Sequence, residues 1–163
     1  MKRIYTLFSL LLIVVSSLSA QTYSELEDID LSSAESCREA EDKVVEASEY
    51  LLSTVCVENL KALNAVKFII DWMEKTEDYT FTLGDGLFDI ISSDNSLTSR
   101  YFAALAKTAI DMEEENADKL LFDATTLFLR YCENPKSKVK VKRKLKKYID
   151  AKNNGTLKDM LKE

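Results

Sequence analysis

The fold is decided by a stretch in the middle of the chain, Phe68-Ile69-Ile70-Asp71-Trp72-Met73, followed after a polar turn by Tyr79-Thr80-Phe81-Thr82-Leu83. In the first part, large apolar side chains recur at helical spacing, which predicts the end of a long helix that buries its bulkiest residues. In the second part, apolar and polar side chains alternate, which is typical of an extended segment. Four rings can meet there: Phe68, Trp72, Tyr79 and Phe81. We expect a core anchor, and a ligand-binding aromatic groove is the alternative.

Helical periodicity continues on both sides of this stretch. Apolar positions predict helices over about 32–54, 57–75, 96–112 and 117–133, and one or two helical turns near 87–91. Leu60 and Leu63 are assigned to the apolar stripe of the second helix, and Asn134-Pro135 ends the fourth because the residue before proline avoids the helical region. The predicted fold class is all-α, an antiparallel helical bundle of about five main helices plus short helical turns, with a solenoid-like stack as the second possibility.

The N-terminus has the pattern of an export signal. Two basic residues at 2–3 precede an apolar run at 7–15 and small residues up to Ala20, which predicts a signal peptide over residues 1–20. We therefore expect export, to the periplasm or the medium, and no transmembrane segment in the mature chain. Residues 21–31 are acidic and lack apolar periodicity, so they are expected to be a flexible acidic arm. Residues 32–163 are expected to form a single helical domain with a basic C-terminal segment, 136–163.

Charge is unevenly distributed along the chain. Residues 21–135 have 9 basic and 25 acidic side chains, whereas residues 136–163 have 11 basic and 3 acidic ones. A helix is predicted over 136–152, with a narrow apolar stripe made of Val141, Leu145, Tyr148 and Ile149. Seven candidate anion-binding residues surround this stripe: Lys138, Lys140, Lys142, Arg143, Lys144, Lys146 and Lys147. This helix either binds a polyanion or lies against the acidic body and neutralises it.

Three cysteines allow at most one disulfide within the chain. If Cys37 and Cys56 stand at opposite ends of one helix, about 28 Å at ~1.5 Å per residue separates them, which no disulfide spans. Any bridge then involves Cys132. Up-and-down alternation of the helices places Cys37 and Cys132 at the same end, provided that the short segment near 87–91 does not reverse the chain direction. The candidate disulfide is therefore Cys37 with Cys132.

Catalysis is not favoured by the residue inventory. Histidine is absent, and no phosphate loop, dinucleotide fingerprint or nucleophile elbow occurs, so no cofactor or metal is expected. We expect a non-enzymatic interaction module of the cell envelope that binds another protein. The alternative is peripheral binding of anionic lipid, lipopolysaccharide or another polyanion through the helix at 136–152. Nucleic acid is a poor candidate because Tyr148 is the only aromatic residue of the basic run.

Several stretches of the chain resemble one group of proteins. They are Trp72-Met73-Glu74-Lys75-Thr76 with Asp78-Tyr79-Thr80-Phe81, Ala103-Ala104-Leu105-Ala106-Lys107 and Glu114-Glu115-Asn116-Ala117-Asp118-Lys119. Over roughly residues 60–150 the chain is similar to short exported bacterial proteins of uncharacterised function. It departs from them at Glu77, where proline is common in that group. The resemblance implies a helical fold and export, and it implies no site.

Overall fold

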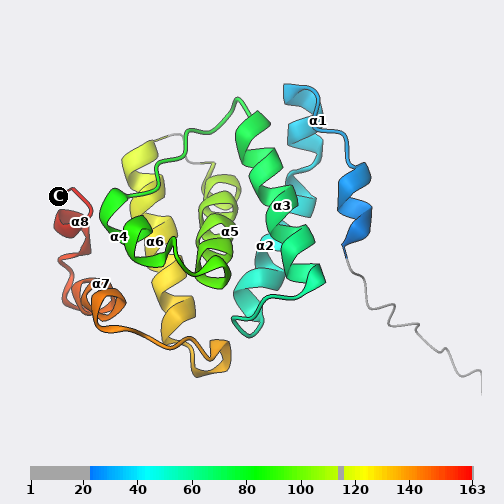
Figure 1. Ribbon diagram of the computed structural model, residues 1–163. Coiled ribbons are helices and arrows are strands. Elements are labelled where there is room, and N and C mark those ends of the chain that lie inside the picture. Colours follow the sequence, from blue (N-terminus) through cyan, green and yellow to red (C-terminus); the bar gives the residue numbers. More distant parts are fainter. Residues whose placement is uncertain (1–22, 114–115, 163) are drawn as a thin grey trace, which may run out of the picture.

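The computed structural model describes residues 23–113 and 116–162 (Figure 1). These residues form α-helices and two short 3-10 helices and include no β-strand. The all-α prediction is therefore confirmed. The predicted signal peptide, residues 1–20, lies outside the described residues.

The elements follow one another with short connections, except between α3 and α4. In chain order they are η1 (Ser24–Asp28), α1 (Ala34–Glu39), α2 (Glu41–Ser53), α3 (Leu60–Lys75), α4 (Asp85–Ile91), α5 (Asn95–Met112), α6 (Ala117–Glu133), η2 (Pro135–Ser137), α7 (Arg143–Asn154) and α8 (Leu157–Met160). In Figure 1 the chain runs down α2, up α3, across the top through residues 76–84, down α4, up α5 and down α6. Thus α2 and α3 are antiparallel, as are α5 and α6, whereas α3 and α5 run the same way.

Helix α5 lies at the centre of the molecule and packs against α2, α3, α4 and α6. Four of its alanines are fully buried, and their small side chains allow the neighbouring helices to approach closely: Ala103, Ala104, Ala106 and Ala109. Its faces belong to two apolar clusters. The N-terminal cluster extends from Tyr23 to Trp72 and includes Ala103 and Ala106. The C-terminal cluster extends from Leu87 to Leu157 and includes Tyr101, Ala104 and Leu105.

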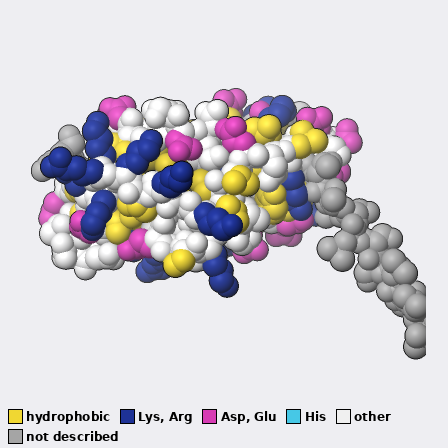
Figure 2. Space-filling view, turned by 60° about the horizontal axis from the view of Figure 1, so that its bottom comes forward, with side chains coloured by type: hydrophobic (Ala, Val, Ile, Leu, Met, Phe, Trp, Pro, Cys, Tyr) yellow, Lys and Arg dark blue, Asp and Glu magenta, His cyan; other side chains and the backbone are white. Residues whose placement is uncertain are grey.

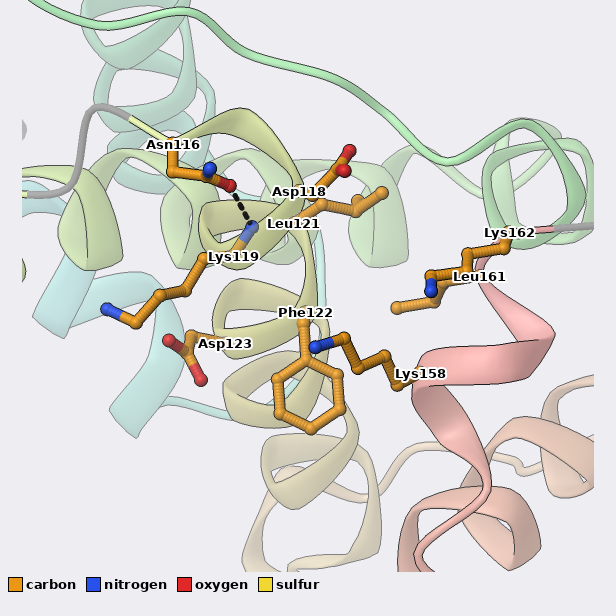
Figure 3. A pocket seen from close by; sticks show the side chains of 9 residues that line it. All are labelled: Asn116, Asp118, Lys119, Leu121, Phe122, Asp123, Lys158, Leu161 and Lys162. Atoms are coloured by element: carbon orange, nitrogen blue, oxygen red, sulfur yellow. Dashed lines mark hydrogen bonds between the residues drawn. The ribbon is translucent and has the colours of Figure 1, made fainter.

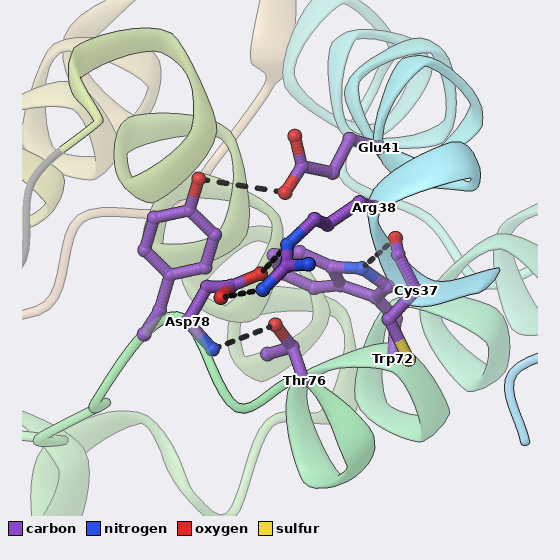
Figure 4. A network of polar contacts seen from close by, with 7 residues as sticks. Cys37, Arg38, Glu41, Trp72, Thr76 and Asp78 are labelled. Carbon is purple, nitrogen blue, oxygen red and sulfur yellow. Dashed lines mark hydrogen bonds and ion pairs between the residues drawn. The ribbon is translucent and has the colours of Figure 1, made fainter. Parts of the chain in front are cut away.

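The aromatic stretch lies in and against the N-terminal cluster (Figure 4). Trp72 has no exposed surface, and its indole N–H donates to the carbonyl oxygen of Cys37 at 2.9 Å. The ring centroids of Tyr79 and Phe81 lie 5.8 and 6.1 Å from that of Trp72. Next to them, the Arg38 guanidinium donates two hydrogen bonds of 2.7 Å to the Asp78 carboxylate. The rings therefore pack against one another and against the core, as expected of a core anchor.

The first predicted helix, 32–54, is interrupted. Helix α1 ends at Glu39 and α2 begins at Glu41, with Ala40 between them. The carbonyl of Cys37, three residues before the interruption, accepts the hydrogen bond from Trp72. The buried indole needs an acceptor, and the end of α1 supplies one, so a tertiary contact accompanies the break in a periodic sequence.

The prediction of a flexible acidic arm at 21–31 is wrong for the described residues 23–31. They include η1, which packs on α3, and they bury Tyr23, Leu26 and Leu31 in the N-terminal cluster. The Lys61 ammonium lies 4.2 Å from the centroid of the Tyr23 ring, which adds a cation–π contact. The spacing of these apolar residues matches neither a helix nor a strand, so periodicity did not reveal them.

Tyr101 gives the fold a dependence on alkaline pH. Its hydroxyl donates to the carbonyl oxygen of Leu83 at 2.7 Å, and burial raises the pKa of its phenol from 10.0 to about 12. Because the folded-state pKa lies above the unfolded one, the contribution is complete below pH 10 and is lost as pH rises to 12. At about 1.4 kcal/mol per pH unit, the loss is roughly 2 to 3 kcal/mol.

We expect urea unfolding from pH 9 to pH 12 to show this loss, and Tyr101→Phe to reduce the slope over that range. At pH 8 the same variant should lower the free energy of unfolding by about 1 kcal/mol because one hydrogen bond is removed. Lysine titration is common to both proteins and cancels in the comparison. Equal slopes for the two proteins would contradict the assignment to Tyr101.

Candidate functional site

The predicted helix at 136–152 is only partly present. Helix α7 begins at Arg143, and residues 138–142 form no helix or strand after η2. Lys138 follows η2 with a left-handed backbone, φ 57°, which stops the helical turn. The run Lys138-Val139-Lys140-Val141-Lys142 alternates charged and β-branched residues, a pattern that favours extended backbone over helix. We call residues 138–147 the basic segment.

Helix α7 is docked on the body of the protein. Leu145, Tyr148 and Ile149 are buried in the C-terminal cluster, whereas Val141, the fourth member of the predicted stripe, is 39% exposed. The Tyr148 hydroxyl lies over Gly86 of α4, so closely that a Cβ atom there would come within 2.6 Å of it. Glycine at position 86 therefore allows α4 and α7 to pack together.

The charges of the basic segment point outward. All seven predicted anion-binding residues are exposed. Lys146 pairs with Asp150 of its own helix at 2.6 Å, and within the described part of the chain none of the other six forms an ion pair. Among the described residues, the one salt bridge from α7 to the body is made by Lys152, which pairs with Glu133 and was not among the predicted residues. Docking of α7 therefore leaves these six cations facing solvent.

The basic segment lies at the end of the molecule that is at the bottom of Figure 1, which we call the lower end. The loop of residues 54–59 is fixed beside it by hydrogen bonds. The Cys56 N–H donates to the carbonyl oxygen of Ser137 at 2.8 Å, and the Tyr131 hydroxyl donates to that of Thr54 at 3.0 Å. Arg100, which is 1% exposed, donates to the carbonyl oxygens of Val55 and Val57, each at 3.1 Å.

A shallow cavity of about 400 Å³ lies where the basic segment meets the start of α5. Its lining includes Lys138, Lys140 and Lys142 together with Asp94. The Asp94 carboxylate accepts from the backbone N–H of Leu97 at 3.2 Å and so caps α5. The charged side chains of the lining are thus three ammonium groups and one carboxylate, which gives this part of the lower end a positive balance.

Exposed apolar side chains also occur at the lower end. Leu60 and Leu63, predicted as core residues of the second helix, are 61% and 50% exposed, because α3 turns its face with Ala62 and Ala65 inward instead. Figure 2 brings the lower end forward and shows Lys and Arg side chains spread over it with hydrophobic side chains and some carboxylates among them. Sequence reasoning missed the exposure of Leu60 and Leu63 because the apolar stripe of this helix is wide enough to be turned in more than one way.

No family model, curated protein or solved structure matches the chain. The resemblance to short exported bacterial proteins stays a prediction. Among the described residues, no helix has the length and apolarity needed to cross a membrane. The same residues contain no cluster of three or more side chains that could hold a metal ion.

The predicted disulfide between Cys37 and Cys132 is not formed, and all three cysteines are free. Cys37 lies near the upper end of the molecule, where its carbonyl meets Trp72 of α3, whereas Cys132 follows Tyr131 at the lower end. The prediction fails because the connection at 76–84 and α4 return the chain to the lower end before α5 begins. Burial, with a smaller contribution from nearby Cys56, raises the pKa of the Cys132 thiol.

A second cavity, of about 620 Å³, lies between the start of α6 and α8 (Figure 3). Its apolar base includes Leu121 and Phe122, and its rim has both carboxylates and ammonium groups: Asp118, Asp123, Lys119, Lys158 and Lys162. None of the predicted site residues lies in it. Because both signs of charge occur around the rim, it lacks the excess of positive charge that the basic segment has.

Proposed function

We propose that this protein is a non-enzymatic peripheral module that binds an anionic surface, such as lipid headgroups or lipopolysaccharide, through its basic segment. The observation that carries the proposal is the outward projection of six cations that have no ion-pair partner within the described ranges, 23–113 and 116–162, at one end of the molecule. Cations paired with the body would have favoured internal neutralisation instead. Export, with an address in the periplasm or the medium, is part of this proposal.

The energetics of such binding are sufficient for reversible attachment. Near an anionic surface each Lys or Arg contributes about 1 kcal/mol, and salt screens this attraction. Residues 21–135, with 25 acidic and 9 basic side chains, are repelled by the same surface. The two effects together orient the molecule with its lower end toward the anions.

Binding of an envelope protein ranks below anion binding. The aromatic rings that such a partner would contact are packed against one another and the core. Nucleic acid also remains a poor candidate, because Tyr148, the aromatic residue of the basic run at 136–152, is 5% exposed and offers no ring for a base to stack on.

Removing three charges from the cavity lining should weaken binding strongly. We expect the triple variant Lys138→Gln, Lys140→Gln, Lys142→Gln to bind anionic vesicles about 100-fold more weakly at low salt, from about 1 kcal/mol per lysine. Vesicle co-sedimentation of the full mature chain, with phosphatidylglycerol in phosphatidylcholine and with phosphatidylcholine alone, measures this. Point variants are preferable to truncation because α7 contributes buried residues to the C-terminal cluster.

The matched control removes the same charge elsewhere. Lys75, Lys158 and Lys162 lie outside the basic segment, and their triple change to glutamine should leave vesicle affinity within about twofold because none of them lines the cavity with Lys138, Lys140 and Lys142. Equal losses in the two triple variants would assign binding to net charge alone. Unchanged binding by the first triple variant would refute the basic segment as the site.

A further inference from the structure

Exposed apolar side chains are concentrated at the lower end. The described residues include five large hydrophobic side chains that are at least 39% exposed: Val57, Leu60, Leu63, Met112 and Val141. Met112 ends α5 at the upper end of the molecule, and the other four belong to the loop, the start of α3 and the basic segment. We call these four residues the apolar surface.

The apolar surface and the basic segment lie at the same end of the molecule. Val57 directly follows Cys56, whose N–H is bonded to Ser137 next to Lys138. Leu60 and Leu63 lie nearly one turn apart on α3, and Val141 stands between Lys140 and Lys142. Apolar and cationic side chains therefore reach solvent at the same end of the molecule, and the loop that bears Val57 is fixed there because its carbonyls accept from Arg100.

We propose that the apolar surface enters the interfacial region of an anionic lipid bilayer while the basic segment binds the phosphates of the headgroups. This inference rests on the proposed function and narrows its ligand to a membrane surface. A bilayer has an anionic layer of headgroups and, a few ångströms deeper, an apolar layer of acyl chains. The lysines can bind the first of these layers while the aliphatic side chains enter the second.

Other occupants fit this face less well. A second copy of the chain docked by the same face would bring two sets of unpaired cations together, which is repulsive. A soluble polyanion would neutralise the lysines but would leave Leu60 and Leu63 in water. An anionic bilayer complements both the positive charge and the exposed aliphatic side chains.

Insertion can be tested with a reporter in the apolar surface. The variant Leu60→Trp keeps a large apolar side chain, and we expect its emission to shift to the blue on phosphatidylglycerol vesicles and to be quenched by lipids brominated on the acyl chains. Trp72 is fully buried and supplies a constant background. Met112→Trp, at an exposed apolar position of the opposite end, should show neither effect.

The energetic test removes the apolar side chains and keeps every charge. We expect Leu60→Ser with Leu63→Ser to weaken vesicle binding on the order of 10-fold at high salt, where the charge contribution is screened. Binding of this variant to inorganic polyphosphate should be unchanged, and Met112→Ser should behave like the unmodified protein in both assays.

The outcomes separate this inference from the proposed function. Unchanged vesicle binding by the double serine variant, with no quenching of Leu60→Trp, would overturn insertion while leaving anion binding by the basic segment intact. Failure of the unmodified protein to bind either vesicles or polyphosphate would overturn both. A double serine variant that instead converted a dimer to a monomer, with vesicle affinity unchanged, would identify the face as an interface between copies and refute the lipid assignment.

Discussion

Replacing Leu145 with aspartate is expected to lower the free energy of unfolding by about 4 kcal/mol. Leu145 is 2% exposed and lies in the C-terminal cluster at the start of α7. The change removes a buried aliphatic side chain and places a carboxylate in an apolar site, where burial of the charge is unfavourable. Urea unfolding followed by circular dichroism measures the difference.

Val141 supplies the control for this variant. It belongs to the same predicted stripe but is 39% exposed, so Val141→Asp should change stability by about 0.5 kcal/mol or less. Both variants introduce the same charge within four residues of each other. If Leu145→Asp were as stable as Val141→Asp, α7 would not be docked as described, and the outward orientation of the lysines would lose its basis.

Replacing Trp72 with alanine is also expected to lower the free energy of unfolding by about 4 kcal/mol. The substitution empties the centre of the aromatic stretch, where Tyr79 and Phe81 pack on the indole, and leaves the Cys37 carbonyl without its donor. Trp72→Phe keeps a ring and loses the N–H, so it should cost about half as much. The same unfolding measurement applies to both variants.

A polar position of the same stretch is the matched control. Thr80 is exposed between the two rings, and Thr80→Ala should lie within about 0.5 kcal/mol of the unmodified protein. If Trp72→Ala also fell in that range, the stretch would not be a core anchor. An equal cost for Trp72→Phe and Trp72→Ala would instead show that the hydrogen bond to Cys37 outweighs ring packing.

The sequence was most informative where local signals agree. The helices predicted over 96–112 and 117–133 match α5 and α6 almost residue for residue, because apolar periodicity is strong and Asn134-Pro135 gives a clear stop. Apolar periodicity could not reveal the interruption at Ala40. It coincides with an indole 35 residues away that takes a carbonyl at the end of α1.

At the candidate site, the sequence supplied the residues without their arrangement. The seven cations are exposed as expected of a charge run, yet residues 138–142 of the predicted helix form no helix, because alternation of Lys and Val competes with helical periodicity. Exposure of Leu60 and Leu63 depends on which face of α3 meets the small residues of α5, which is a matter of packing between distant segments. The disulfide prediction depended on chain direction, and the short helix α4 decides that direction.

The position of α5 between the two apolar clusters has a consequence for the order of events during synthesis. Residues 23–75 contain most of the N-terminal cluster, but Ala103 and Ala106 complete it. The first half of the chain therefore lacks one wall of its own core until about thirty further residues have left the ribosome. It must remain loosely structured while it waits, and both halves then close on the same helix, so the molecule is expected to acquire its structure late and in a single step.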